Sequence, residues 1–490
     1  MALAIFLISW SESMKWSAII HIIGMMLEIE GLLMGGCALV GLYYGEPSGL
    51  YFLGGMVMIS LIGAIMRKIF PQGVYYAREG FIIVSLGWIV MSLAGALPFF
   101  LSGQIPNYAD ACFETISGFT TTGASILNNV EGLDKCMLFW RSLTHWIGGM
   151  GILVFMLAVL PMTGGYNMHL MKVESPGPTV DKLVPKVSQT ARILYAIYFA
   201  MTVAEIIILR LGGMHLFDCV TISFGTAGTG GFGVLNDSCA SYSAFCQVVT
   251  GIFMVLFGVN FNVLYLVAKN KWKDALSSTE VRVYFGIILG ATVTIALSIM
   301  GMYGGIARAL KEAFFQVSSI ITTTGFSTAD FDMWPAVSKM ILFMLMFVGA
   351  CASSTGGGIK VSRILIGIKI VKREILTFVH PKVVKGIKLD GRKVDKEVER
   401  SVAGYFILYF VIMGISCFLV SVDGFDFETN VTSVAATLNN IGPGFSKVGP
   451  MGNFADFSVF SKIVLMFDML AGRLELFPMI VLLFPRLHRR

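Results

Sequence analysis

Long apolar runs limit most strongly how this chain can fold. About 20 apolar residues in a helix are enough to cross the hydrocarbon core of a bilayer. Only 13% of the 490 residues are charged, whereas a soluble domain carries about 25%. The runs therefore predict an all-α polytopic membrane protein, with spans near 17–44, 49–68, 79–102, 137–160, 190–211, 244–268, 283–303, 336–352, 400–422 and 458–484.

Lysine and arginine gather in alternate loops between these spans. The rich loops hold Arg67, Lys68, Lys172, Lys182, Lys186, Arg192, Lys269, Lys271, Lys273, Arg282, the run from Lys369 to Arg400, and Arg486, Arg489 and Arg490. The other loops hold few basic residues and many acids, among them Asp110, Glu114, Asp218, Asp330 and Asp426. Basic loops face the cytoplasm, so both termini are expected there.

The same distribution excludes several classes of function. The net charge of +6 does not form the basic surface stripe of a nucleic-acid-binding protein. The eight cysteines include no CxxC pair and no His-Cys ligand spacing, so neither a metal site nor a disulfide framework is indicated. The six histidines form no H-E-x-x-H or Ser/His/Asp set within the spans, and we expect no enzyme activity.

Four short semi-polar pieces interrupt the pattern of full spans, at 108–119, 215–226, 309–321 and 429–439. By the loop charges, all four lie on the outer side. Each leads into a glycine-bearing segment: "TTTGAS" at 120–125, "GTGGFG" at 228–233, "TTTGFS" at 322–327 and "NNIGPGF" at 439–445. The aligned glycines are Gly123, Gly231, Gly325 and Gly442, roughly a hundred residues apart. Internal repeats of this kind are typical of transport folds.

The physics of the bilayer favours an ion pathway at these segments. Irregular backbone at membrane depth is tolerated only where it is buried or lines a watery cavity. Four such segments around one axis can aim backbone carbonyls at a cation and replace its water shell. The short helix before each segment would point its negative C-terminal end at that cation. A single "TTTG" could be an ordinary turn, but four copies in matching places favour the ion pathway.

The predicted fold is four pseudo-symmetric helix–pore-loop–helix repeats around a central pore, preceded by two extra transmembrane helices. The extra helices occupy 1–72. Repeats 1 to 4 occupy 73–165, 166–275, 276–395 and 396–490.

Six stretches of the sequence resemble a known family. "ETISGFTTTGAS", "HWIGGMGILVF", "ESPGPTVDKLVPKVSQTARILY", "CASSTGGGIKVSRI", "NNIGPGF" and "AGRLELFP" are similar, in content and order, to signatures of the Trk/Ktr/HKT superfamily of potassium transporters. The two extra N-terminal spans match its TrkH-type members, and the resemblance covers nearly the whole chain.

The resemblance implies a channel-like, K⁺-selective uptake protein of the bacterial cytoplasmic membrane, with one pore in each subunit of a homodimer. It implies no cofactor, with potassium as the transported substrate. In the superfamily, serine in place of the first filter glycine accompanies sodium transport, and here that position is Gly123. The glycine-rich second segment leaves its register open by one residue. The implied K⁺ ligands are Thr121, Thr122, Gly123, Thr229, Gly230, Gly231, Thr323, Thr324, Gly325, Asn440, Ile441 and Gly442.

A further glycine cluster, Gly356, Gly357 and Gly358, follows the span that begins at 336. It lacks the G-x-x-x-x-G-K-[ST] pattern of a phosphate-binding loop. A simple kink would explain it, but the resemblance favours an intramembrane gate loop at 351–360, with Lys360 included. Arg473 lies inside the last span. A charge there is costly and usually functional, so we assign it to the gate; the alternative is an ion pair with Asp468 or Glu475.

The resemblance also implies a cytosolic partner. TrkH-type proteins dock on a TrkA-like ring of nucleotide-binding RCK domains, and the basic stretch from Lys369 to Arg400 would face it. The alternative explanation of that stretch is control of topology and attraction to anionic membrane lipid. Two other functions stay open: a sodium-conducting or Na⁺/K⁺ co-transporting relative, and the potassium-binding subunit of an ATP-driven pump. The sequence leaves open whether flux is passive or coupled, and what Glu28, Glu30, Glu205 and His145 do.

Overall fold

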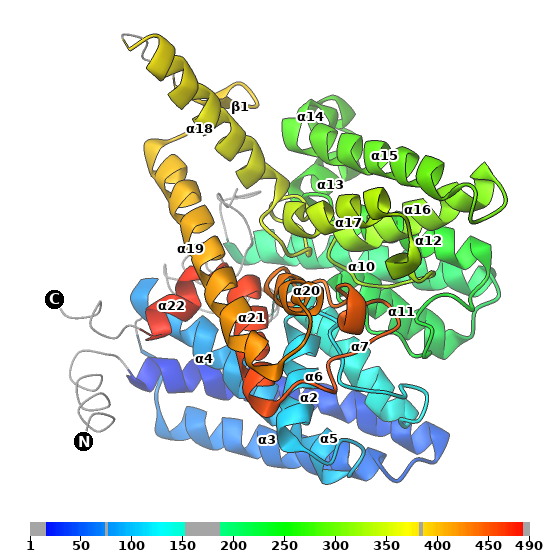
Figure 1. Ribbon diagram of the computed structural model, residues 1–490. Helices are drawn as coiled ribbons and strands as arrows, with labels where there is room; N and C mark the ends of the chain where they lie inside the picture. Colours follow the sequence, from blue (N-terminus) through cyan, green and yellow to red (C-terminus); the bar gives the residue numbers. More distant parts are fainter. Residues whose placement is uncertain (1–15, 74–76, 152–186, 382–385, 484–490) are drawn as a thin grey trace.

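The computed structural model describes residues 16–73, 77–151, 187–381 and 386–483, and these residues are largely helical (Figure 1). The end of the expected span 137–160 lies outside the described residues, as do Lys172, Lys182, Lys186, Arg486, Arg489 and Arg490.

The first two helices, α2 (Trp16–Tyr44) and α3 (Gly49–Ile69), form a hairpin along one side of the molecule (Figure 1). Small residues bring the two backbones together. A Cβ on Gly24 would lie within 3.0 Å of the Gly63 carbonyl oxygen, and one on Gly41 would meet Gly49 equally closely. Because lipid offers no hydrophobic drive for helix association, such close backbone packing is how membrane helices hold together.

The rest of the chain consists of four units. In each unit a long helix is followed by a short helix, an irregular segment and a returning helix. The first unit has α4 (Ala77–Gly95), α5 (Leu97–Leu101), α6 (Tyr108–Phe119) and α7 (Lys135–Met150). The second has α10 (Val187–Leu211), α11 (Leu216–Gly228), α12 (Ala244–Phe257), α13 (Phe261–Ala268) and α14 (Trp272–Ser277).

The third unit has α15 (Thr279–Ile299), α16 (Ile306–Ile321), η1 (Phe331–Met333), α17 (Ala336–Val348) and α18 (Val361–Val379). A small antiparallel hairpin follows, with β1 (Lys388–Leu389) paired to β2 (Arg392–Lys393). The fourth has α19 (Lys396–Val420), η2 (Ser421–Asp423), α20 (Phe427–Leu438), η3 (Ser446–Val448), α21 (Val459–Arg473) and α22 (Phe477–Leu483).

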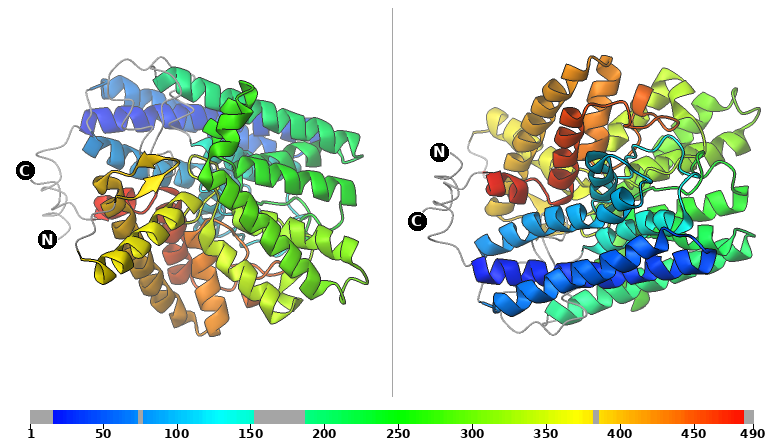
Figure 2. Two further views of the ribbon diagram at one scale, coloured as in Figure 1. Left: turned by 90° about the horizontal axis from the view of Figure 1, so that it is seen from above. Right: turned by 90° about the horizontal axis from the view of Figure 1, so that it is seen from below.

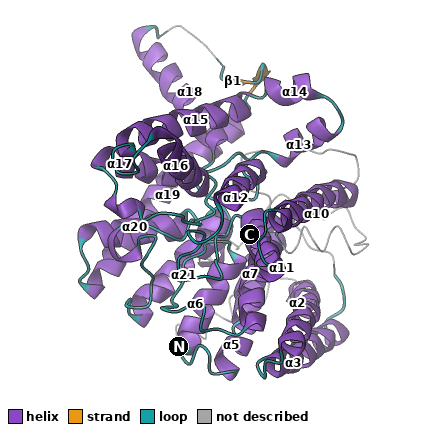
Figure 3. Ribbon diagram, turned by 90° about the vertical axis from the view of Figure 1, so that its right-hand side faces the viewer, coloured by secondary structure: helices purple, strands orange, loops and turns teal. Residues whose placement is uncertain are grey.

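The four units follow one another around a common centre, as the order of colours in Figure 2 shows. Irregular segments fill the interior and helices form the rim (Figure 3). We call α6, α11, α16 and α20 the short helices. Their ends agree within three residues with the semi-polar pieces expected from the sequence.

Six described helices are long and apolar enough to cross a membrane, and a seventh crossing results if the bent pair α12 and α13 counts as one. Three expected spans are interrupted. The span at 244–268 bends by 102° between α12 and α13. The span at 336–352 ends at Val348, and the last one divides into α21 and α22. Residues beside each break contact the end of a short helix: Gly258 lies against Thr322, Gly357 against Asn439 and Gly472 against Leu438. Hydropathy alone does not reveal these breaks.

Candidate functional site

All four short helices end in the same capping geometry. One or two residues past the helix end, the backbone is left-handed, with a φ of 55° at Thr121, 55° at Thr229, 59° at Thr323 and 55° at Asn440. The next N–H then donates to the carbonyl five residues earlier, at 2.8–2.9 Å, for Thr122→Ser117, Gly230→Gly225, Thr324→Ser319 and Ile441→Ala436. This is the Schellman arrangement, in which a left-handed residue turns the chain sharply out of a helix.

Threonine is an unusual residue for that position. Glycine normally occupies it, because a β-branched side chain in the left-handed region is strained by about 1–3 kcal/mol. Three of the four positions are nevertheless threonine, and all four side chains are buried. Strain that recurs at equivalent places in one molecule indicates a functional constraint on the backbone.

Two residues further on, each segment has its glycine, again with positive φ: 78° at Gly123, 78° at Gly231, 87° at Gly325 and 94° at Gly442. The spacing from left-handed residue to glycine is the same in every unit. It therefore fixes the register of the second segment, with Thr229 and Gly231 at the positions of Thr121 and Gly123.

The four glycine-bearing segments, 120–125, 228–233, 322–327 and 439–445, pack side by side in a closed ring. A Cβ on each glycine would lie within 3.0 Å of a carbonyl oxygen in the next segment, closer than real Cβ atoms come. The pairs are Gly123 with Gly230, Gly231 with Thr324, Gly325 with Ile441, and Gly442 with Thr122. Each carbonyl belongs to the residue just before the neighbour's glycine, so one contact repeats four times around an axis. We call this arrangement the glycine ring.

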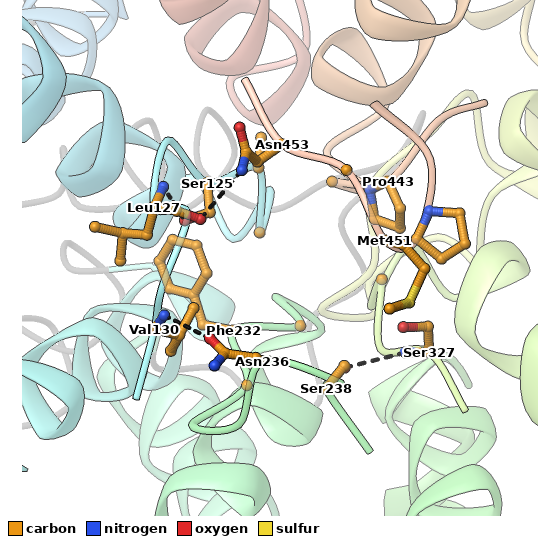
Figure 4. A pocket seen from close by; sticks show the side chains of 18 of the residues that line it. Ser125, Leu127, Val130, Phe232, Asn236, Ser238, Ser327, Pro443, Met451 and Asn453 are labelled. Atoms are coloured by element: carbon orange, nitrogen blue, oxygen red, sulfur yellow. Dashed lines mark hydrogen bonds between the residues drawn. The ribbon is translucent and has the colours of Figure 1, made fainter. Parts of the chain in front are cut away.

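A cavity of about 140 Å³ opens on one side of the ring. All four ring glycines line it, together with residues that follow them (Figure 4). Hydrogen bonds between neighbouring units join residues of its wall: Val130 N donates to Asn236 Oδ1 at 2.8 Å, and Ser327 N to Ser238 Oγ at 3.2 Å (Figure 4). The cavity is thus a shared vestibule of the four segments.

Comparisons with known proteins agree with this geometry. The family model TrkH, described as a cation transport protein, matches residues 51–487. The chain belongs to the TrkH family of cation transport proteins.

Individual TrkH relatives match along almost their whole length. The "Trk system potassium uptake protein TrkH" of Salmonella typhimurium is 37% identical over 492 residues, covering 97% of this chain and all of the relative. The "Trk system potassium uptake protein TrkG" of Escherichia coli is 33% identical, covering 94% and 96%. These relatives are transport proteins, in agreement with the expectation that the chain is not an enzyme.

A solved structure, the crystal structure of the potassium transporter TrkH from Vibrio parahaemolyticus, superposes with a TM-score of 0.86. It shares 33% identity and covers 97% of this chain and all of its own. The likeness confirms the predicted fold class, an all-α polytopic membrane protein with the TrkH architecture.

In this TrkH-family chain, the residues assigned to the gate lie directly beneath the ring. After α17 ends at Val348, residues 349–360 form an irregular loop before α18, which we call the loop 349–360. Gly357 N donates to Thr323 Oγ1 at 2.6 Å. A Cβ on Gly357 would come within 3.0 Å of the Asn439 carbonyl oxygen, and one on Gly356 would come as close to Thr322. The loop is therefore in contact with the third and fourth segments.

Two cationic side chains, Lys360 and Arg473, donate hydrogen bonds to carbonyls of the loop 349–360. The buried Lys360 ammonium donates to the Gly356 carbonyl within the loop. Arg473, at the end of α21, donates to Thr355 O at 2.8 Å and to the Gly148 and Gly149 carbonyls of the first unit, both at 2.5 Å. Arg473 thus bridges the loop 349–360 and the end of α7.

The acids considered as alternative partners of Arg473 have other contacts. Glu475 forms an ion pair with Arg363, the first-turn arginine of α18. Asp468 accepts a hydrogen bond from Ser416 Oγ at 2.7 Å.

Sequence reasoning missed one anchor of the loop. Glu280, on the first turn of α15, is 6% exposed. Its Oε1 accepts from Ala352 N at 2.7 Å and from Ser362 N at 3.1 Å, so one carboxylate joins the loop to the first turn of α18. A glutamate 72 residues before Ala352 gives no local signal for this role.

The four residues whose roles the sequence left open lie in different surroundings. Glu28 pairs with Arg67 between α2 and α3. Glu30 and Glu205 are completely buried. His145 lies behind the second segment: its Nδ1 is 2.7 Å from the Gly118 carbonyl, and its Nε2 accepts from Phe232 N at 3.2 Å. That pattern fits a neutral imidazole at a helix junction.

Proposed function

We propose that this chain is a potassium uptake protein that conducts K⁺ through the glycine ring. The observation that carries the proposal is the repeated contact between each ring glycine and the neighbouring segment's carbonyl. A ring of backbone carbonyls replaces the hydration shell of a cation. The names of the relatives, which include a potassium uptake protein and a potassium transporter, support potassium as that cation.

The proposed ligands are backbone carbonyls of the triplets 121–123, 229–231, 323–325 and 440–442. The four short helices end at these triplets, so their negative C-terminal dipoles would favour a cation there. The vestibule would collect ions from the outer side, and outer acids such as Asp218 and Asp330 would raise their local concentration.

The loop 349–360, with Arg473, is proposed as the gate. Its contact with Thr323 and Asn439 supports a position across the pathway just beneath the ring. Arg473 would add a fixed positive charge that opposes a passing cation. Release of the loop toward α18, together with a shift of Arg473, would open the path.

The assembly around this pore is also a proposal. Basic loops predict cytoplasmic termini in a bacterial inner membrane, and the family resemblance supports a homodimer. The cytoplasmic extension from α18 through the β1–β2 hairpin would meet a nucleotide-binding RCK ring. Such a partner would bias the gate allosterically.

Ion-dependent thermal stability tests the filter independently of transport. An ion that binds the folded protein raises its unfolding temperature by mass action. At equal ionic strength, K⁺ and Rb⁺ should stabilise the purified protein more than Na⁺ or Li⁺. Equal stabilisation by all four ions would contradict a K⁺-selective ring and favour the sodium-conducting alternative.

A further inference from the structure

A buried ion pair of the first unit lies beside the vestibule. Glu114 lies on α6 and Arg141 on α7, and their side chains are 0% and 2% exposed. Arg141 Nε donates to Glu114 Oε1 at 2.7 Å, and Nη2 lies 2.7 Å from the same oxygen. Among the ion pairs of the described residues, this is the most deeply buried.

Glu114 holds the first segment just after its ring glycine. Its carboxylate accepts from Ser125 Oγ at 3.0 and 3.1 Å and from Ile126 N at 3.1 Å. Ser125 is only two residues beyond Gly123. Hydrogen bonds to an ionised carboxylate are short and about twice as strong as neutral ones, so this part of the segment is fixed to α6.

Arg141 holds the second segment at the equivalent position, two residues beyond its ring glycine. Its Nη1 donates to Gly233 O at 3.1 Å, and the guanidinium lies 4.0 Å from the centre of the Phe232 ring. One helical turn later, His145 accepts from Phe232 N at 3.2 Å. Residues four apart share one helix face, so α7 holds the second segment at two adjacent points.

A contribution to folding stability does not by itself explain why these two charges are buried. Desolvating two charges costs several kcal/mol per ion, and apolar replacements of a buried pair are often neutral or stabilising. The pair does, however, use its remaining donors and acceptors on segments 1 and 2 only two residues beyond Gly123 and Gly231. Ligand geometry of this kind is held by the shell of residues behind it.

Resting on the proposed potassium function, we propose that Glu114 and Arg141 are positioning residues for ion selectivity. They fix segments 1 and 2 against each other, so the carbonyls at Gly123 and Gly231 cannot close around a smaller ion. Neither side chain needs to touch the ion. Loss of the pair should let the ring relax and admit sodium, while the fold and the gate stay in place.

Two variants test this inference. Glu114→Gln keeps the size of the side chain but removes the charge and presents an amide to the guanidinium. The double variant Glu114→Gln with Arg141→Met leaves no buried charge unpaired, so it should fold even if the single variant does not. Asp110→Asn is the matched control, because it removes a second ion pair of α6, with Lys462 at 2.7 Å, away from the ring.

The readout is ⁸⁶Rb⁺ uptake into proteoliposomes, with potassium and sodium as competitors. In both test variants the ratio of sodium to potassium inhibition constants should fall by about tenfold, the size of effect seen when residues that orient the ligands of a metal site are changed. It should stay unchanged in Asp110→Asn. A wild-type ratio in both folded test variants, with lowered unfolding temperatures, would show a purely structural pair and overturn the inference. A wild-type protein that does not prefer potassium would instead overturn the proposed function.

Discussion

At the scale of single residues, the site depends on backbone conformation more than on side-chain chemistry. Three threonines and one asparagine have left-handed φ at equivalent positions, and the ring glycines leave no space for a Cβ. Such strain persists only where the surroundings enforce it. The Gly357–Thr323 hydrogen bond then joins one strained residue directly to the loop beneath the ring.

Gly123→Ser tests the ring at this scale. The new Cβ would be forced against the Gly230 carbonyl at a φ of 78°, so the ring should widen or tilt. We expect the preference for potassium over sodium in ⁸⁶Rb⁺ uptake to fall by about tenfold.

Gly103→Ser is the matched control for that variant. Gly103 has nearly the same φ, 76°, but nothing lies within 4 Å of a Cβ there. Backbone strain alone would affect both variants, whereas a ring contact affects only Gly123→Ser. Unchanged selectivity in both would refute a filter at Gly123.

At the scale of elements, the short helices and the loop 349–360 are each fixed by a few capping contacts. Glu280 is the clearest, since one carboxylate accepts from an amide of the loop and from an amide in the first turn of α18. Asp426 is another: it caps α20 by accepting from Thr429 N at 3.1 Å and Thr429 Oγ1 at 2.5 Å. We expect the loss of the Glu280 contacts to change the rate of transport, and the loss of the Asp426 contacts to change stability.

Glu280→Ala should release the loop and raise ⁸⁶Rb⁺ uptake by the protein alone. Losing two buried hydrogen bonds to a charged group weakens the closed position by about 3 kcal/mol. Thr294→Ala, on the exposed face of the same helix, should leave the rate unchanged. Equal or slower uptake by well-folded Glu280→Ala would argue against a gating role for the loop.

Asp426→Ala should lower stability in a pH-dependent way. The Thr429 hydroxyl and amide, which donate to the carboxylate, lower the pKa of Asp426. Its contribution is therefore present above the unfolded-state pKa, about 3.9, and disappears as pH falls through the lower folded value. At pH 7 the variant should lose about 1 kcal/mol.

Thermal unfolding in detergent measures that loss. The difference between wild type and Asp426→Ala should shrink as the pH falls below about 4. Asp456→Ala, at a carboxylate 75% exposed, serves as control. A difference that stays constant with pH would exclude the ionised cap as the cause.

At the scale of the whole molecule, the sequence predicted the four-unit plan and the places of the short helices, because apolar length and loop charge are local signals. Four glycines with a common spacing likewise indicated the ring. Hydropathy could not show the break between α12 and α13, and the repeat-2 register needed the left-handed Thr229. Contacts such as Glu280–Ala352 and Arg141–Gly233 join distant residues, and no pattern in one sequence links them.

Uptake of ⁸⁶Rb⁺ into liposomes holding the purified protein tests whether the glycine ring selects potassium. Excess potassium outside should abolish uptake, whereas the same concentration of sodium should leave it nearly unchanged. Glu280→Ala, expected to be open, is measured alongside so that a closed gate cannot hide the filter. Equal block by sodium and potassium, in either protein, would show that the glycine ring does not select potassium.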